Sequence, residues 1–505
     1  MIKLIYRIES DYMSKKRMLI VTSVTLSVVT ISLGIVKLYQ TYALSNYIGT
    51  VTDTGIDVYI NDDSYASIPA NGSSNVYYML TNTNPGTVKY GVAYQTTSGV
   101  TVKVYDTSED PATGTIEEND KKYIKLHLEN KNSTNKTIEL STVLGYENGG
   151  DLVVPSGVTL VTDTYTPPPT AAEYITKLYT TASKTTVTNN SITYNTAPSV
   201  SLMNDRLGGT TTDLDGGNIR YYGASPNNYI YFNCSDYSNQ TSSTCETWRI
   251  IGVFDGKLKL IRGSQIGTYS WDNKDTSTGA ESNFGKNDWT TARLMKLLNP
   301  SDYYTTDSND NNLGQGLYYN SASGKCYSGQ NNATVDCNFT STGIKNDITR
   351  NMIAETTYNL GGWNSNTVYP NLMYEKERGT TVYTGRPTTP WTGKIALAYT
   401  SDYGYAADLN QCKDKTLYDY NNSTCTSNNW MKAIITNNGS NSGWLLTPYC
   451  STSSNVWYVY SVGNVYFNYT VYSAFGAVPV LSLSSELGIE SGGDGSSSNP
   501  YKLSA

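Results

Sequence analysis

The chain has 505 residues, enough for about two to four domains, and only 16% of them are charged. Its formal net charge of −7 disfavours a nucleic-acid partner, which would require a basic face. A single histidine, His127, rules out Ser-His-Asp and Cys-His catalysis and metal sites built on several histidines, and its spacing in an alternating segment predicts a sheet residue.

The composition favours a mainly β protein with long polar loops. The chain has 45 tyrosines against 6 phenylalanines, amid abundant Ser, Thr, Asn and Gly. Tyrosine and threonine prefer strands, whereas asparagine and glycine suit turns.

Residues 18–36 are uncharged and mostly apolar. Nineteen residues of helix, at about 1.5 Å each, cover a hydrocarbon core of about 30 Å. Lys15, Lys16 and Arg17 precede the run, so we expect a cytoplasmic basic lead (1–17), a transmembrane signal anchor (18–38) and an exported remainder. The alternative is a signal peptide cleaved near residues 43–45, but the apolar run is longer than the usual signal-peptide core.

Residues 48–165 predict an immunoglobulin-like β-sandwich that acts as a spacer. Segments of alternating polarity recur between turn signals, as in such sandwiches. The expected strands are 50–60, 75–80, 88–94, 99–105, 123–128, 137–143 and 157–161.

Residues 166–201 form a predicted linker: a proline run, a short helix at 171–179 and an irregular polar stretch. A larger head follows at 202–490, and residues 491–505 are the expected C-terminal tail. In the head, residues 228–232, 247–254 and 257–261 predict antiparallel strands, and residues 290–298 and 346–356 predict helices, the second capped by Asn346.

Six of the seven cysteines form three couples separated by ten or twelve residues: Cys234 and Cys245, Cys326 and Cys337, and Cys412 and Cys425. These spacings suit disulfides that close hairpins or loops and are too long for a zinc knuckle. Six cysteines can join in about 15 ways, and buried free thiols are the alternative. Disulfides indicate an oxidising compartment. Cys450 is left over, as a buried thiol or an intermolecular bridge.

Several stretches of the head resemble a domain of unknown function in exported proteins of gut Firmicutes. They are Asn-Ile-Arg-Tyr-Tyr-Gly-Ala at 218–224, Asn-Tyr-Ile at 228–230, Trp-Arg-Ile-Ile-Gly-Val at 248–253 and Gly-Trp-Leu-Leu-Thr-Pro at 443–448. The last is similar to the family's Trp-Leu-(Arg/Thr)-(Ser/Thr)-Pro signature. Residues 476–483 resemble its Gly-Val-Arg-Pro-Val-Leu-x-Leu ending, except that the arginine before the proline is absent here.

The resemblance covers residues 205–490 and implies a disulfide-clamped α+β head with large loops that displays a ligand-binding surface. The Trp and Gly pattern of the family is similar to C-type-lectin-like and formylglycine-generating-enzyme-like folds.

Aromatic residues between 444 and 472 are the main candidate for a ligand-binding surface. Alternation along a strand would direct Trp457 into the core and Tyr458 and Tyr460 to solvent. With Tyr449 and Tyr469, these tyrosines could stack on sugar rings or contact a protein. The alternative is a core with surface tyrosines that bind nothing.

The remaining candidates for chemistry are weaker. Glu375 and Glu377 could form a carboxylate pair, although solvated loop charge is the favoured interpretation. Residues 307–311 and 213–216 resemble incomplete calcium loops, and ordinary turns account for both. We therefore expect no metal, cofactor or catalytic residue.

Together these patterns predict a single-pass membrane protein of the bacterial cell surface. A β-sandwich spacer would carry a lectin-like adhesion module for a glycan or protein ligand, without covalent chemistry. One alternative is an extracellular enzyme, either a carboxylate hydrolase or a cysteine-dependent oxidase. Another is an architectural component of the envelope.

Overall fold

The computed structural model describes residues 47–50, 57–60, 65–82, 86–146, 152–206, 217–273, 284–305, 313–329, 333–365, 367–379, 381–383, 386–387 and 390–504. The expected basic lead (1–17) and signal anchor (18–38) lie outside these ranges. Within the described ranges, every helix falls short of the length or the apolar character needed to cross a bilayer.

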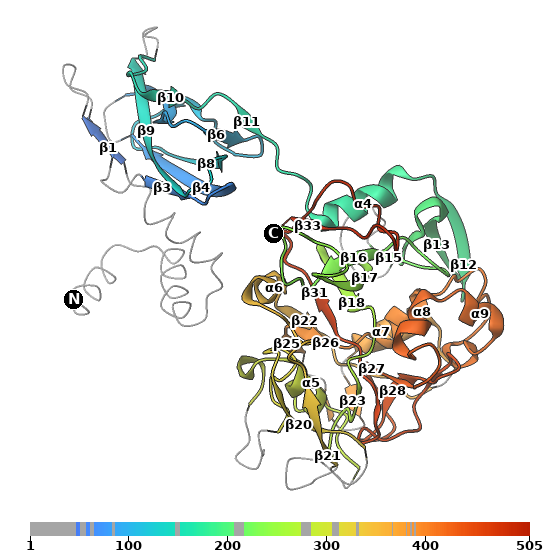
Figure 1. The fold of residues 1–505 in the computed structure, drawn as a ribbon. Helices are drawn as coiled ribbons and strands as arrows, with labels where there is room; N and C mark the ends of the chain where they lie inside the picture. The colour runs from blue at the N-terminus through green and yellow to red at the C-terminus, as the bar shows by residue number, and fades with distance from the viewer. Residues whose placement is uncertain are drawn as a thin grey trace. The chain divides into compact units, whose positions relative to one another are not determined.

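The protein is mainly β, as the composition predicts, with 37% strand and 15% helix. The chain divides into two compact units, Met1–Pro167 and Pro168–Ala505. Figure 1 shows the elements of both units.

Among its described residues, the first unit contains two sheets that enclose one core. One sheet has the order β10 (Val158–Leu160), β5 (Val88–Gln95), β9 (Lys136–Tyr146) and β3 (Tyr65–Ile68), with β7 (Thr113–Ile116) paired to β5. The other has the order β11 (Thr164–Tyr165), β6 (Val100–Tyr105), β8 (Lys121–Asn130) and β4 (Gly72–Thr81). A separate pair consists of β1 (Tyr47–Thr50) and β2 (Asp57–Ile60).

Alternation along the strands builds this core. On β8, Ile124, Leu126 and Leu128 point into the core, while His127 lies on the opposite face. There the His127 ring stacks on Tyr165, with 3.6 Å between ring centroids. His127 is thus a sheet residue, and the immunoglobulin-like assignment stays a prediction.

The largest sheet of the second unit, the head, has nine strands among the described residues. Eight follow in the order β12 (Thr185–Asn189), β13 (Ile192–Ala197), β14 (Leu202–Asn204), β15 (Ile219–Tyr221), β17 (Glu246–Phe254), β18 (Lys257–Arg262), β31 (Val480–Ser482) and β26 (Ile395–Ala396). The ninth, β16 (Tyr229–Phe232), pairs with β17. Asp255 and Gly256 join β17 to β18 with φ values of 50° and 71°, as the expected tight hairpin requires.

A second sheet of the head has the order β19 (Thr268–Tyr269), β30 (Phe475–Gly476), β27 (Gly443–Pro448), β28 (Val456–Val459) and β29 (Val465–Tyr466). Smaller pairs are β20 (Ser323–Tyr327) with β21 (Thr334–Asn338), β22 (Thr356–Tyr358) with β25 (Trp391–Gly393), β23 (Thr381–Tyr383) with β24 (Arg386–Pro387), and β32 (Gly488–Ile489) with β33 (Leu503–Ser504).

Short helices cover the sheets of the head. They are α4 (Ala171–Thr181), α5 (Arg293–Leu298), α6 (Asp347–Met352), α7 (Pro370–Glu377), α8 (Thr400–Tyr405), α9 (Ser423–Ser427) and α10 (Trp430–Ile435). The side chain of Asn346 caps α6 as expected, accepting a hydrogen bond from the Thr349 amide at 2.9 Å. The 3₁₀ turns are η1 (Pro198–Val200), η4 (Ser301–Tyr303) and η5 (Leu417–Asp419).

The stretch expected to be a linker belongs to the head. Helix α4 starts at a capping box in which Thr170 and Glu173 bond each other's backbone amides at 2.8 and 3.2 Å. The following polar residues are not irregular, because they form β12 and β13 at the edge of the largest sheet. The expected tail also packs on the head, with the Tyr501 amide donating to the Tyr229 carbonyl at 2.9 Å.

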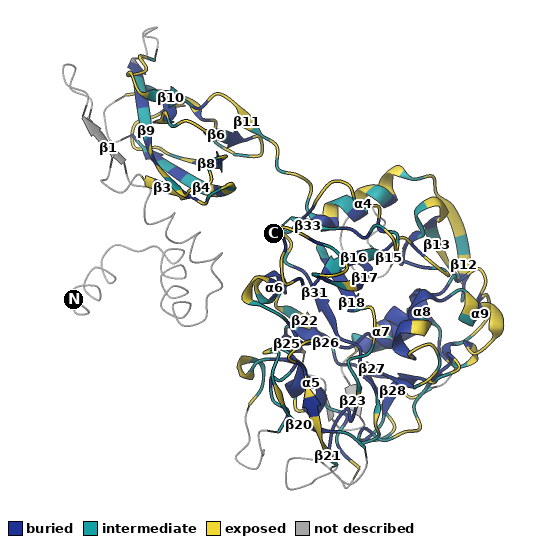
Figure 2. Cartoon of the chain, viewed as in Figure 1, coloured by how far each residue is buried: buried dark blue, intermediate teal, exposed yellow. Residues whose placement is uncertain are grey.

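Two hydrophobic cores lie on opposite faces of the second sheet. Adjacent residues of β28 belong to different cores, Trp457 to one and Tyr458 to the other. Figure 2 shows α8, β27 and β28 as buried elements, and all residues of the three are buried. The second sheet is therefore covered on both faces along β27 and β28.

Candidate ligand-binding site

A cavity of about 320 Å³ opens at the end of the β28–β29 hairpin. Its lining consists of tyrosine and asparagine side chains with one valine: Asn421, Tyr458, Tyr460, Val462, Asn464, Tyr466, Asn468 and Tyr469. We call it the tyrosine–asparagine cavity. Three of the four tyrosines that the sequence indicates, Tyr458, Tyr460 and Tyr469, meet there.

The hairpin turn holds the mouth of the cavity in place. The Tyr460 amide donates to the Asn464 carbonyl at 2.8 Å, and the Gly463 amide donates to the Tyr460 carbonyl at 2.7 Å. Gly463 has a φ of 108°, which glycine adopts without the strain that a side chain would add. The turn thereby fixes Tyr460 and Asn464 on either side of an exposed Val462.

Two tyrosine rings of the cavity are available to a ligand. Tyr460 is 41% exposed and Tyr469 is 46% exposed. The ring centroids of Tyr460 and Tyr466 lie 6.1 Å apart, and those of Tyr469 and Phe475 lie 5.2 Å apart. Each exposed ring is thus supported by another ring, which holds its orientation at little entropic cost.

Tyr458 differs from the expectation, because it is only 1% exposed. Its ring contacts Trp444 and Phe475, with centroid distances of 6.1 and 4.9 Å. Its hydroxyl donates to Asn468 Oδ1 at 2.5 Å, and burial raises the pKa of that hydroxyl. Tyr458 therefore forms the floor of the cavity, and the prediction that it faces solvent is wrong.

Tyr449 lies outside the lining of this cavity. It is half-buried, its ring is stacked on Phe467 with 4.1 Å between centroids, and it meets Trp457 edge-on at 5.7 Å. Trp457 is fully buried in the core, as expected. Tyr449 thus packs on the Trp457 side of the sheet and supports the core.

Four lining residues were missed at the sequence level: Asn421, Val462, Asn464 and Asn468. Tyr466 belongs to the aromatic residues between 444 and 472 that the sequence indicated. Asn464, Tyr466 and Asn468 stand at alternate positions, and this period-two pattern would have placed them on one face of an extended segment. Asn421 comes from the loop after η5, and no local pattern predicts its place here. Its neighbour Tyr418 reaches the hairpin, where its hydroxyl lies 2.7 Å from that of Tyr466.

The cavity can supply neutral hydrogen-bonding groups but no charge. Its lining residues have no ionised side chain at neutral pH. Among the described residues, Asn464 Oδ1 is buried without a hydrogen-bond partner. An amide of this kind at a cavity wall is suited to an incoming hydroxyl or amide group.

Glu375 and Glu377 do not act as a pair. Glu375 is exposed on α7 and lies 3.3 Å from Lys376 Nζ. Glu377 is fully buried, where Ser401 Oγ and Thr447 Oγ1 donate to its carboxylate at 2.5 and 2.8 Å. Burial raises the pKa of Glu377. The interpretation of Glu377 as a solvated loop charge is therefore wrong.

A buried ion network lies next to Glu377. Arg220 bridges two carboxylates, with its Nε 2.5 Å from Asp205 Oδ2 and its Nη1 2.9 Å from Asp402 Oδ1. Lys259 Nζ lies 2.5 Å from Asp402 Oδ2. Burial raises the pKa of Asp402, but the attraction of Lys259 and Arg220 outweighs it and leaves that pKa below its ordinary value. The network joins β15, β18 and α8 and accounts for the burial of these charges.

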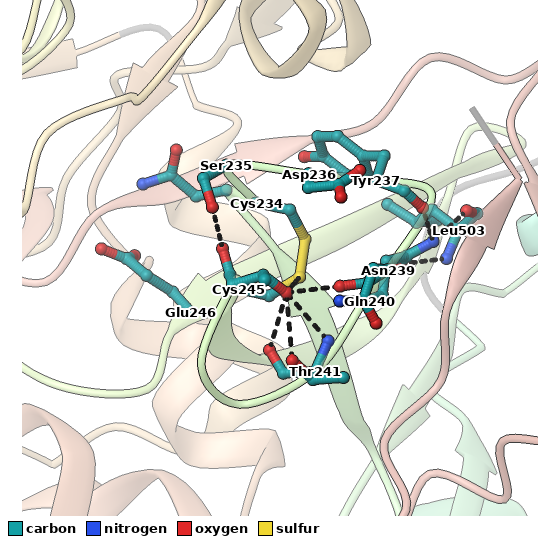
Figure 3. Close-up of a disulfide and its surroundings, with 12 residues drawn as sticks. Cys234, Ser235, Asp236, Tyr237, Asn239, Gln240, Thr241, Cys245, Glu246 and Leu503 are labelled. Carbon is teal, nitrogen blue, oxygen red and sulfur yellow. Dashed lines mark hydrogen bonds between the residues drawn. A yellow bond between two sulfur atoms is a disulfide. The ribbon is translucent and has the colours of Figure 1, made fainter.

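The three disulfides are Cys234–Cys245, Cys326–Cys337 and Cys412–Cys425, the pairs that the spacing indicates. Figure 3 shows the first with its loop, where Gln240 reaches the C-terminal strand and bonds Leu503 through both its amide nitrogen (2.7 Å) and its amide oxygen (2.9 Å). Cys450 stands outside these disulfides and is half-buried.

The described part of the chain contains no cluster of three or more His, Cys, Asp or Glu residues suited to a metal ion. The two oxygen-rich segments considered for calcium, 307–311 and 213–216, lie outside the described residues.

Comparison of the chain with protein-family models, curated proteins and solved structures found no match.

Proposed function

We propose that the protein is a membrane-anchored cell-surface protein whose head binds a neutral glycan at the tyrosine–asparagine cavity. A single observation carries the proposal: two exposed tyrosine rings flank an uncharged cavity lined with asparagine side chains. The apolar face of a sugar ring stacks on aromatic rings, and its hydroxyls pair with amide groups.

The packing of the exposed tyrosine rings against other rings favours ligand binding over exposed side chains without a function. Exposed aromatic side chains scattered singly are common on protein surfaces and need no function. Here Tyr460, Tyr466 and Tyr469 converge on one hollow, and the hydroxyl of Tyr458 fixes Asn468 at its floor. A preformed site of this kind binds with a smaller loss of conformational entropy.

The disulfides support the cellular location. Such bonds persist in oxidising surroundings, so three of them in one unit favour a head outside the cytosol. The uncharged run at residues 18–36, with basic residues before it, favours an anchor that leaves the C-terminal part outside.

An array that carries both glycans and proteins, probed with the full chain produced under oxidising conditions, tests the proposal. We expect binding to neutral glycans, and about two- to tenfold weaker binding for Tyr460→Ala and for Tyr469→Ala. Tyr65→Ala is the matched control, because Tyr65 is 55% exposed on β3 of the other unit and should leave binding unchanged.

The other outcomes each exclude the glycan proposal. Binding to protein spots that the same variants weaken would assign the surface to a protein ligand. No detectable binding to any spot, together with self-assembly of the chain, would favour an architectural component of the envelope.

A further inference from the structure

A cavity of about 580 Å³ lies elsewhere in the head and shares no lining residue with the tyrosine–asparagine cavity. Its walls come from β16, β17, the end of β18, the loop closed by Cys234–Cys245, and α10 with the turn after it. The lining residues are Tyr229, Ser242, Cys245, Glu246, Thr247, Arg249, Arg262, Gly263, Ser264, Ala433, Ile434, Asn437 and Asn438.

Arg249 lines this cavity and is only 6% exposed. Its guanidinium carbon lies 3.6 Å from the centroid of the Tyr229 ring and 4.9 Å from that of Trp430. Its Nε donates to Asn228 Oδ1 at 2.5 Å and its Nη2 to the Pro226 carbonyl at 3.2 Å. Aromatic and polar neighbours thus fix the plane of the guanidinium in one orientation.

No carboxylate in the described part of the chain balances this charge. Among the described residues, Arg249 forms no ion pair, and its hydrogen bonds are donated by Nε and Nη2. Burial lowers the pKa of Arg249 to about 10, so the guanidinium stays charged at neutral pH. A buried charge without a counter-ion is costly, and a bound anion would offset that cost.

The other charged residues of the lining neutralise each other. Arg262 forms a bidentate ion pair with Glu246, in which Nε lies 3.0 Å from Oε2 and Nη2 lies 3.1 Å from Oε1. The remaining nitrogen of Arg262, Nη1, donates to Ser264 Oγ at 2.8 Å. The cavity is therefore left with one uncompensated positive charge, at Arg249.

We propose that this cavity binds the carboxylate of an acidic sugar, with Arg249 as the anion-binding residue. One uncompensated positive charge matches a monoanion, whereas the second negative charge of a phosphate dianion would have no partner in this lining. The side chains of Ser242, Thr247, Asn437 and Asn438 supply hydroxyl and amide groups around the charge, and these suit the hydroxyls of a sugar ring.

The disulfide Cys234–Cys245 positions one wall of the site. Ser242 lies on the loop that it closes, and Glu246 follows Cys245 directly on β17. Within that loop the Cys245 amide donates to the Thr241 carbonyl at 2.9 Å. The loop (Figure 3) is thereby held rigid beside the cavity before any ligand binds.

Isothermal titration calorimetry on the full chain tests the proposal. The probes are D-glucuronate, D-galacturonate and N-acetylneuraminate, with D-glucose as the neutral match and inorganic phosphate as the bare anion. We expect at least one acidic sugar to bind about tenfold or more tightly than either glucose or phosphate, and Arg249→Met to remove that preference.

A second variant keeps the test valid if Arg249→Met fails to fold. Asn438 is exposed and has a φ of 55°, a conformation that aspartate tolerates, so Asn438→Asp adds a negative charge without a change of shape. It should weaken acidic-sugar binding severalfold at low salt. Asn421→Asp makes the same change in the tyrosine–asparagine cavity and should leave the affinity for the acidic sugar unchanged.

Three results would overturn the assignment: no heat with any acidic sugar, equal affinity for phosphate or (in a Tyr460→Ala background, which weakens the other cavity) for glucose, or acidic-sugar binding that both Arg249→Met and Asn438→Asp leave unchanged. None of them bears on the neutral glycan, because that proposal depends on Tyr460 and Tyr469.

Discussion

Trp457 and Tyr458 are neighbours on β28, yet their side chains enter different hydrophobic cores of the head. Trp457 Nε1 donates to the Trp363 carbonyl at 3.2 Å on one face of the sheet, and the Tyr458 hydroxyl donates to Asn468 at 2.5 Å on the other. The strand is thus covered on both faces, and each residue holds one layer to the sheet.

Both Trp457→Ala and Tyr458→Ala should lower the free energy of unfolding, by about 3–5 kcal/mol each. Each removes a buried aromatic ring and leaves a cavity. Tyr458→Phe keeps the ring and should cost only about 1 kcal/mol, for the lost hydrogen bond. Urea unfolding of the head measures these changes. If Tyr458→Ala matched the exposed variant Tyr460→Ala in stability, Tyr458 would not be part of the core.

Local patterns predicted much of the fold. Alternation identified most strands of the first unit, and the Asp255-Gly256 pair identified the hairpin between β17 and β18. The spacing of the cysteines indicated the three disulfides. In the misjudged stretch before residue 201, the threonines of β12 and β13 face one another, with Thr185 Oγ1 2.9 Å from Thr196 Oγ1. Threonine is a strand former, so that signal was present in the sequence.

The sites depend on contacts that local patterns do not contain. Alternation placed Tyr458 and Trp457 on opposite faces correctly, but which faces are covered depends on residues brought from elsewhere, such as Phe475. Arg249 meets Trp430 across 181 residues of chain, and Asn421 reaches the β28–β29 hairpin from an earlier loop. Such long-range packing is fixed by the tertiary fold.

Arg220→Met should destabilise the head by about 3–5 kcal/mol, because it leaves Asp205 and Asp402 buried with one partner fewer. Chemical denaturation at neutral pH measures the loss. Lys325→Met is the matched control, since its ion pair with Asp336 is exposed and should contribute little. A loss for Arg220→Met no larger than for Lys325→Met would mean that the buried network does not hold β15 and α8 together.

The imidazole of His127 should titrate below its ordinary pKa of 6.5, because burial lowers the pKa and outweighs the attraction of Glu129. The unfolded chain then binds more protons in the window just below pH 6.5, so the stability of the first unit falls as the pH drops through it. As the chain has one histidine, a single imidazole NMR signal reports the titration. A midpoint above 6.5 would contradict the buried stacking on Tyr165.

Denatured but unreduced protein should contain one reactive thiol, because six of the seven cysteines lie in disulfides. Alkylation followed by mass spectrometry counts the thiols, and reduction before alkylation should raise the count to seven. Each loop closure contributes about 2–4 kcal/mol, so reduction should also lower the melting temperature of the head. Seven thiols before reduction would place the protein in a reducing compartment and remove the support for a surface location.

Asp272 should make the head less stable as the pH rises from about 4 to about 6. Burial raises the pKa of this carboxyl to about 6, although the backbone amides of Lys286 and Arg293 donate to it at 3.0 and 3.2 Å. The folded state therefore keeps a proton that the unfolded state loses above its ordinary pKa of 3.8. The difference corresponds to about 3 kcal/mol of stability lost across that window. Urea unfolding at pH 4 and pH 6.5 measures the change in the free energy of unfolding between the two pH values. This change should be about 3 kcal/mol less favourable in the unmodified protein than in Asp272→Asn, whose side chain stays neutral throughout. An identical pH effect in the variant would show that Asp272 is ionised over the whole range and that its burial is compensated.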